Sequence, residues 1–185
     1  MARKLWIFGA IAATLAACSQ PVYRTRSEPL RTVASVDLAR YAGRWFEIYR
    51  LPNGFEDADC ASVTADYAPR PDGLLQVVNT CVKPGGDFDR SRGVARVVDP
   101  LSRSRLEVSF FRPFWGNYWI IELSDDYSWA MIAEPSGKYL WLLARTPAIS
   151  GEVDAQVIAR MTELGYPVGK LIKPANLLPV PGVSP

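Results

Sequence analysis

From residue 44 to residue 145 the sequence is a succession of short β-type segments with no helical stretch between them. Each segment is rich in β-branched, aromatic or aliphatic residues, and Pro, Gly, Asn, Asp or Ser marks the turns. The predicted strands are 44–51, 60–67, 74–82, 92–99, 104–111, 117–123, 128–133 and 138–145. Because most links are short, this order predicts an all-β, eight-stranded up-and-down antiparallel barrel, with an interior wide enough for one small ligand.

Residues 150–164 change to helical periodicity, and Gly165 supplies a stop. The apolar stripe of this segment is Val153, Val157, Ile158, Met161 and Leu164. We therefore expect one C-terminal α-helix, with barrel and helix together spanning residues 36–173. The Pro-rich residues 174–185 are predicted to form a loose tail.

Residues 1–17 are typical of a bacterial export signal. Two basic residues precede the uncharged run Leu5–Ala17, whose 13 residues are too few to span a bilayer as a helix. The run ends in Leu-Ala-Ala-Cys, which resembles a lipoprotein lipobox and predicts lipidation of Cys18. Two alternatives remain, an ordinary secretory signal and an uncleaved membrane anchor. Residues 18–35 are then the lipidated N-terminus and a flexible tether, and Ser19 favours the outer membrane by the rule for lipoproteins.

The absence of histidine excludes many enzyme classes. Ser-His-Asp hydrolysis, Cys-His proteolysis, His-ligated haem and His-based zinc sites all require that residue. Removal of the signal leaves 19 basic and 19 acidic residues, which argues against nucleic acid as a partner. The sequence also lacks a Gly-rich phosphate loop and a metal-ligand cluster, so we predict neither a cofactor nor a metal.

Lipidation of Cys18 leaves Cys60 and Cys81 as a pair. An oxidising periplasm favours a disulfide, and the alternative is two buried thiols. The turn 69–73 lies between the strands that carry them. If Tyr67 pairs with Leu74 across this hairpin, Cys60 lies directly opposite Cys81, close enough to bridge.

Three motifs resemble those of the lipocalins. Gly43-Arg44-Trp45 is similar to their G-x-W motif on the first strand, and Asp125-Asp126-Tyr127 is similar to T-D-Y, with Asp in place of Thr. Arg145 matches the third motif, an arginine packed across the motif tryptophan. In an up-and-down barrel all three fall at one end, where Trp45 and Arg145 close the floor by cation–π stacking. Within the family, segments 108–118 and 139–150 resemble bacterial outer-membrane lipocalins and apolipoprotein D.

The opposite end is then the mouth, and its links carry aromatic residues: Phe55, Phe88, Phe114 and Trp115. These residues either contact lipid, a membrane or a second copy of the chain, which makes a homodimer one expectation, or fold inward as a partial lid.

Strand alternation predicts which side chains line the pocket. Trp45 at the floor places Glu47 and Tyr49 on the inner face of the first strand, where Glu47 either meets a lipid head group or is a structural carboxylate. Inward faces of the fifth and sixth strands are assigned by their apolar character, and a β-bulge would reverse any of them. The candidate ligand-binding residues are Glu47, Tyr49, Val108, Phe110, Trp119 and Ile121.

The resemblance implies a non-enzymatic protein that binds fatty acids or lysophospholipids in a calyx and maintains the envelope. We expect it to be anchored at the outer membrane, with the barrel facing the periplasm. One alternative is a structural or interaction lipoprotein with a vestigial calyx. Another is a lipocalin-fold enzyme, which requires a free thiol at Cys60 or Cys81, or paired inward carboxylates.

Overall fold

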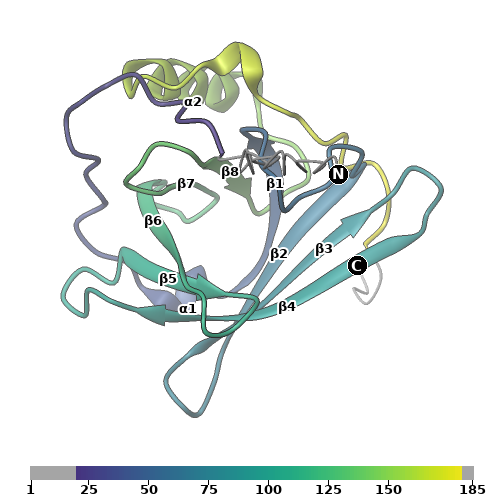
Figure 1. Cartoon of the computed structure of the whole chain (residues 1–185). Helices are drawn as coiled ribbons and strands as arrows, with labels where there is room; N and C mark the ends of the chain where they lie inside the picture. Colours follow the sequence, from purple (N-terminus) through teal and green to yellow (C-terminus); the bar gives the residue numbers. More distant parts are fainter. Residues whose placement is uncertain (1–19, 181–185) are drawn as a thin grey trace, which may run out of the picture.

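The computed structural model describes residues 20–180, which form a closed antiparallel barrel in which each strand pairs with the next and β8 returns to β1 (Figure 1). The strands are β1 (Gly43–Arg50), β2 (Ser62–Pro69), β3 (Leu75–Val82), β4 (Phe88–Val97), β5 (Arg105–Ser109), β6 (Gly116–Leu123), β7 (Trp129–Ala133) and β8 (Leu140–Ala144). The helices are α1 (Leu38–Tyr41), α2 (Gly151–Glu163) and the 3₁₀ turn η1 (Val168–Lys170). The predicted fold class is confirmed, and neither α-helix in this part of the chain is long and apolar enough to cross a membrane.

The predicted strands agree with the observed ones in number and order, and differ at their ends. The largest difference is at β4, which begins at Phe88 rather than at residue 92. Its first five residues are exposed and, after Phe88, polar, but they pair with β3 along the ladder from Phe88 to Ala95. The β3–β4 link is therefore a tight hairpin instead of a long loop.

Two apolar clusters lie on opposite sides of the barrel wall. One fills the barrel interior around Trp45, and the other lies between the outer face of the sheet and α2. Ser150 caps the N-terminus of the helix, and its side chain accepts a hydrogen bond from the backbone N–H of Val153. Val157 and Met161 are fully buried against the sheet, so the predicted apolar stripe is confirmed as the face that packs on the barrel.

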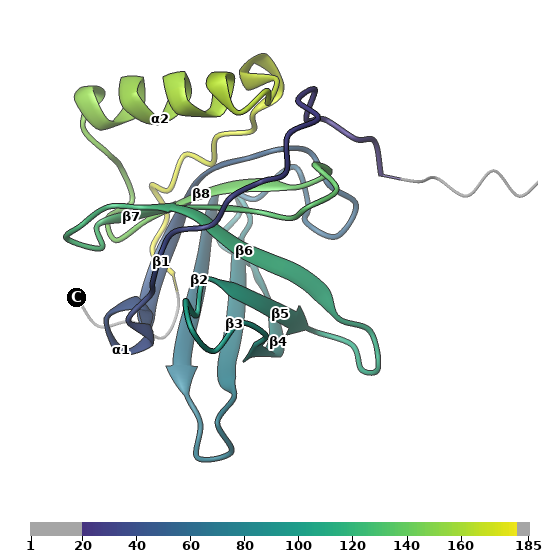
Figure 2. The same ribbon diagram turned by 90° about the vertical axis from the view of Figure 1, so that its left-hand side faces the viewer.

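Residues 20–35 do not form the flexible tether that their composition predicts. The segment runs along the outside of the barrel beside α2 (Figure 2), and the backbone N–H groups of Tyr23 and Arg24 donate to the carbonyl of Gly137. Further along, Val33 N–H donates to the Ile120 carbonyl, and Leu30 is buried in the outer cluster. Tertiary hydrogen bonds and one buried leucine thus override a polar, Pro-containing composition. Residues 1–17, Cys18 and Ser19 lie outside the described residues.

The Pro-rich tail is also held in place as far as Val180. Asn176 lies where β1 and β2 separate, and its side-chain Nδ2 donates to the Glu47 carbonyl at 2.6 Å. Its Oδ1 accepts from Val63 N–H at 3.1 Å, and its own N–H donates to the Ala61 carbonyl. Asn176 therefore bridges β1 and β2 beyond the point where their direct pairing ends. The prediction of a loose tail is wrong for residues 174–180.

Cys60 and Cys81 form a disulfide, although the register used to predict their pairing is wrong. Val63, rather than Cys60, lies opposite Cys81 in the β2–β3 ladder. Cys60 precedes β2, and the chain there turns back so that the two Cα atoms are 5.4 Å apart. Pro69 pairs with Leu75, so the turn lies at residues 70–74 rather than at 69–73, and the ladder is shifted from the predicted Tyr67–Leu74 pairing.

The three motif segments meet at one end of the barrel, as predicted. The Arg145 guanidinium lies 3.8 Å from the centroid of the Trp45 ring. Its N–H groups donate at 2.5–3.3 Å to four backbone carbonyls, those of Arg40, Tyr41, Arg44 and Tyr127. The first strand, the last strand, α1 and the β6–β7 link are therefore joined through one side chain, which closes the floor.

Replacement of this guanidinium is expected to destabilise the whole fold. Arg145→Leu leaves four carbonyls without their charged donor, so we expect the free energy of unfolding to fall by about 2–4 kcal/mol. Arg145→Lys restores a charge but not the planar fork, and is expected to recover only part of that loss. Urea denaturation measures both variants, and equal stability of Arg145→Leu and wild type would show that the floor does not depend on this contact.

Candidate functional site

The lower half of the barrel interior is aromatic and apolar. Trp45 is fully buried above the floor, and its Nε1 donates to the Tyr41 carbonyl. Three tyrosine hydroxyls meet here: Tyr67 donates to Tyr118 at 3.0 Å, and Tyr118 and Tyr41 share a hydrogen bond of 2.6 Å. Burial raises the pKa of all three phenols, so they stay protonated at neutral pH and act only as hydrogen-bonding groups.

Nearer the mouth the interior carries a buried arginine. Arg50, at the end of β1, is 1% exposed. Its Nη1 donates to Glu47 Oε1 at 2.6 Å, and its Nη2 donates to the Asp57 carbonyl at 2.6 Å. Its Nε has no hydrogen-bond partner among the described residues, the nearest carboxylate oxygen being Glu56 Oε2 at 3.7 Å. The guanidinium thus lies between two carboxyl groups, and its Nε–H remains available to donate to a ligand oxygen.

Glu47 is a buried carboxyl whose pKa is raised. Burial is the main cause, and the neighbouring carboxylate of Glu56 adds to it, while Arg50 acts in the opposite direction. Two carboxylates beside one arginine cannot both ionise cheaply inside a barrel. We therefore treat Glu47 as the carboxyl group that keeps its proton beside Arg50.

The β1–β2 link folds across the mouth and supplies Glu56. The Glu56 backbone N–H donates to Asn53 Oδ1, and its carboxylate accepts a hydrogen bond from Trp141 Nε1 at 2.8 Å. Phe55 packs on Tyr139, with ring centroids 5.2 Å apart, and Tyr139 stacks on Trp141. One wall of the mouth is consequently aromatic, with a carboxylate at its inner edge.

Half of the predicted pocket residues face the interior. Glu47 lies inside on β1, and Val108 belongs to the interior cluster on β5. Phe110 packs over Gly93, where a Cβ would come within 2.8 Å of its ring. Gly93 pairs with Val77, an interior residue, so Phe110 lies on the inner side of the rim.

Tyr49, Trp119 and Ile121 lie on the outer face, and their predicted inward orientation is wrong. β1 has a bulge between Glu47 and Tyr49, so Tyr49 turns outward and its hydroxyl donates to Asp154 of α2. On β6 the apolar face covers the outside because α2 and residues 20–33 pack there. An apolar strand face predicts burial, and β6 is buried on both faces, at Ile120 on the inside and at Ile121 on the outside.

Three interior residues were missed by sequence reasoning: Arg50, Glu56 and Trp141. The sequence gives no signal for Arg50, because nothing local distinguishes a buried arginine from an exposed one. Trp141 lies two residues before Leu143 on β8, so strand alternation places both side chains in the interior and could have predicted Trp141. Glu56 lies in a loop, where no periodicity applies.

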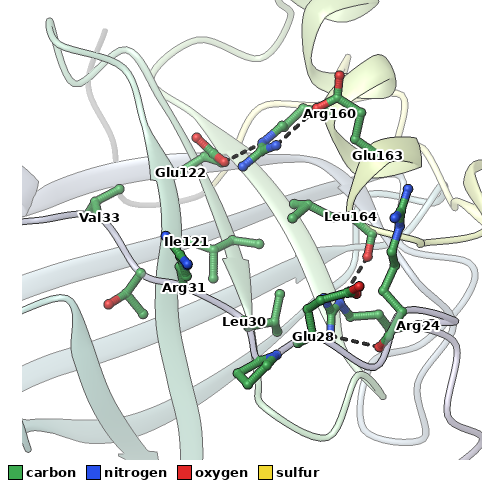
Figure 3. Close-up of a pocket in the computed structure, with 13 residues that line it drawn as sticks. Arg24, Glu28, Leu30, Arg31, Val33, Ile121, Glu122, Arg160, Glu163 and Leu164 are labelled. Carbon is green, nitrogen blue, oxygen red and sulfur yellow. Dashed lines mark hydrogen bonds and ion pairs between the residues drawn. The ribbon is translucent and has the colours of Figure 1, made fainter.

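A hollow lies outside the barrel, between residues 24–33 and α2 (Figure 3). It has a volume of about 430 Å³ and a floor that includes Leu30 and Ile121. Arg160 spans it, pairing with Glu122 at 2.6 Å and Glu163 at 3.0 Å. Its walls carry charges of both signs, many already paired, so the barrel interior remains the candidate site for an apolar chain.

Comparison with known proteins agrees with this geometry. The family model for the lipocalin-like domain matches residues 36–176. The chain belongs to the lipocalin family. The match covers the barrel, α2 and the start of the tail, and it includes every residue that faces the interior.

The chain is also similar to individual members of this family. The chain is 40% identical over 157 residues to outer membrane lipoprotein Blc of Escherichia coli K12, a match that covers 84% of this chain and 86% of the relative. It is 26% identical to mouse apolipoprotein D, covering 73% and 74% of the two chains. Among solved structures, insecticyanin from the tobacco hornworm matches with a TM-score of 0.64 and 20% identity, covering 82% of this chain and 87% of insecticyanin, which supports the fold alone.

The protonated Glu47 predicts a specific pH dependence of stability. Above its ordinary pKa near 4.5, the unfolded chain releases a proton that the folded chain keeps. Stability therefore falls as the pH rises from there toward the pKa of the folded state, by up to about 1.4 kcal/mol per pH unit. Glu47→Gln keeps the acceptor for Arg50 and is expected to remove this slope in urea melts between pH 4.5 and 7. Glu107→Gln, on the outer face, should keep it; identical slopes for Glu47→Gln and wild type would contradict the assignment.

Proposed function

We propose that this lipocalin binds the single acyl chain of a fatty acid or lysophospholipid inside its barrel and is anchored by lipid at the outer membrane. The observation that carries the proposal is the amphipathic interior, with an apolar floor and a buried arginine near the mouth. Such a lining is complementary to a molecule with one apolar tail and one charged head.

The tail supplies the free energy. Each methylene buried contributes about 0.8 kcal/mol, so about ten of them supply roughly 8 kcal/mol before ordering costs. That corresponds to micromolar affinity at best, which suits a carrier that must also release its ligand. Val108 and Tyr118 face the interior and are only half-buried, so they are the wall residues that a chain would cover.

The head group is expected to lie against Arg50 and Glu56. The free Arg50 Nε–H suits a phosphate or carboxylate oxygen. A fatty acid carboxylate would compete with Glu56 for this guanidinium. A zwitterionic lysophospholipid offers a phosphate to Arg50 and an ammonium group to Glu56, so the arrangement favours it over a free fatty acid.

Membrane location rests on the N-terminal sequence and on the relatives. The lipobox ending at Cys18, followed by Ser19, has the pattern of an outer-membrane lipoprotein, and relatives at 35–40% identity bear that name. We propose that the acylated chain faces the periplasm and serves envelope maintenance.

The enzymatic alternative has little support. Cys60 and Cys81 are joined in a disulfide, so neither offers a thiolate. The interior does hold the paired carboxylates Glu47 and Glu56, but both flank Arg50, which is the arrangement of a structural or head-group site. Binding without chemistry is the proposal that these groups support best.

A bulky residue inside the barrel is expected to block the acyl chain. Val108→Trp fills the interior, and we expect at least about a tenfold loss of lysophospholipid affinity, the equivalent of roughly two methylene contacts. Glu107→Trp adds the same ring to the outer face of the same strand and should bind like wild type, as should Trp119→Ala.

Native mass spectrometry of the chain from Ser19, purified without detergent and titrated with lysophospholipid and fatty acid, measures the one-to-one adduct. Equal binding by Val108→Trp, in a variant whose melting temperature shows that it is folded, would place the ligand elsewhere. A dominant dimer with no adduct would favour the interaction lipoprotein instead.

A further inference from the structure

The N-terminal segment ends beside the mouth of the barrel. Gln20 is the first described residue, and its Nε2 donates to the carbonyl of Pro52 in the β1–β2 link at 2.5 Å. Tyr23 and Arg24 are fixed to Gly137 in the neighbouring β7–β8 turn. The segment is therefore held at two mouth links before it passes on toward α1.

This attachment limits how far the barrel can lie from its anchor. Cys18 precedes Gln20 by two residues, and two residues of extended chain span at most about 7 Å. Acyl chains on Cys18 enter a membrane within that reach of Gln20. The mouth, rather than the floor or α2, is consequently the part of the barrel nearest the lipid surface.

The mouth also carries the most exposed phenylalanines of residues 20–180. Phe111 is 77% exposed and Phe114 is 70% exposed in the β5–β6 loop, and Phe55 is 64% exposed in the β1–β2 link. Both links lie on the side of the barrel where the N-terminal segment leaves the described fold (Figure 2). Exposed aromatic side chains gathered at one end are typical of a surface that meets lipid or protein.

The charges of these links suit the interfacial region of a membrane. The β5–β6 loop, Phe-Phe-Arg-Pro-Phe-Trp, has no acidic residue, and Arg112 lies 5.3 Å from the centroid of the Trp115 ring. An arginine among aromatic side chains places its guanidinium at the phosphates while the rings enter the acyl region. In the β1–β2 link, Asp57 and Asp59 are paired with Lys83, which reduces the negative charge facing the lipid.

We propose that the protein docks mouth-down on the phospholipid surface that holds its anchor, with Phe111 and Phe114 inserted and Arg112 at the phosphates. This inference rests on the anchor at Cys18 in the proposed function. It adds that the short attachment at Gln20 sets the orientation, so that a lysophospholipid or fatty acid would pass between bilayer and barrel without crossing water.

Depth-dependent quenching tests this orientation in the acylated chain. Phe111→Cys places a free thiol in the β5–β6 loop, because Cys18 is acylated and Cys60–Cys81 is bridged. Leu101→Cys is the matched control, since Leu101 is 93% exposed in the β4–β5 link at the floor end. Each is labelled with a fluorophore and reconstituted into phosphatidylethanolamine–phosphatidylglycerol vesicles that contain a phospholipid with a nitroxide on its acyl chain. We expect the label at 111 to lose most of its fluorescence and the label at 101 to keep it.

Two outcomes overturn the docked orientation and leave the carrier intact, and a third removes the anchor that both proposals share. Equal or stronger quenching at 101 would place the floor on the membrane. No quenching at either position, in protein whose mass includes the acyl chains and which floats with the vesicles, would leave the carrier intact and remove the docked orientation. A mass without acyl chains would remove the anchor on which both proposals depend. Phe114→Cys is a second reporter in the same loop and must agree with the label at 111.

Discussion

The guanidinium of Arg145 joins the first and last strands of the barrel, and the rest of the structure depends on that junction. It lies on Trp45 and donates to four carbonyls from α1, the start of β1 and the β6–β7 link. An up-and-down barrel with one open end needs the other end sealed without leaving buried carbonyls unpaired. A planar cation with five donors does this better than any apolar side chain, because it satisfies several carbonyls at once.

Closure at the floor makes the interior asymmetric. Below, Trp45 and the three linked tyrosines fill the space between the strands. Above, the strands separate and polar side chains enter: buried Arg50 donates to Glu47 and lies 3.7 Å from the Glu56 carboxylate. Such a buried arginine is rarely retained for stability, since an apolar residue of similar size often serves as well. Its place next to the mouth is better explained by a charged head group.

The outside of the barrel is equally uneven. α2, residues 20–33 and the tail cover β1, β6, β7 and β8, and the strands on this side carry apolar side chains on both faces. The same covering fixes the N-terminal segment at the mouth, so the attachment to a membrane and the entrance to the site share one end of the molecule. The path of the chain outside the barrel therefore links the orientation of the protein on the membrane to the end at which a ligand would enter.

Strand number, strand order, α2, the floor motifs and the cysteine pair could all be predicted from the sequence, because each rests on local composition or on counting strands. The inner and outer faces of β1 and β6 could not. A bulge between Glu47 and Tyr49 and another between Ile120 and Glu122 shift the alternation, and α2 buries the outer face as thoroughly as the barrel buries the inner one. Whether Arg50 is buried, and whether residues 20–35 and 174–180 are held, depends on hydrogen bonds between residues far apart in the chain. Local periodicity determines that a strand forms; only the packing of distant segments decides what each of its faces meets.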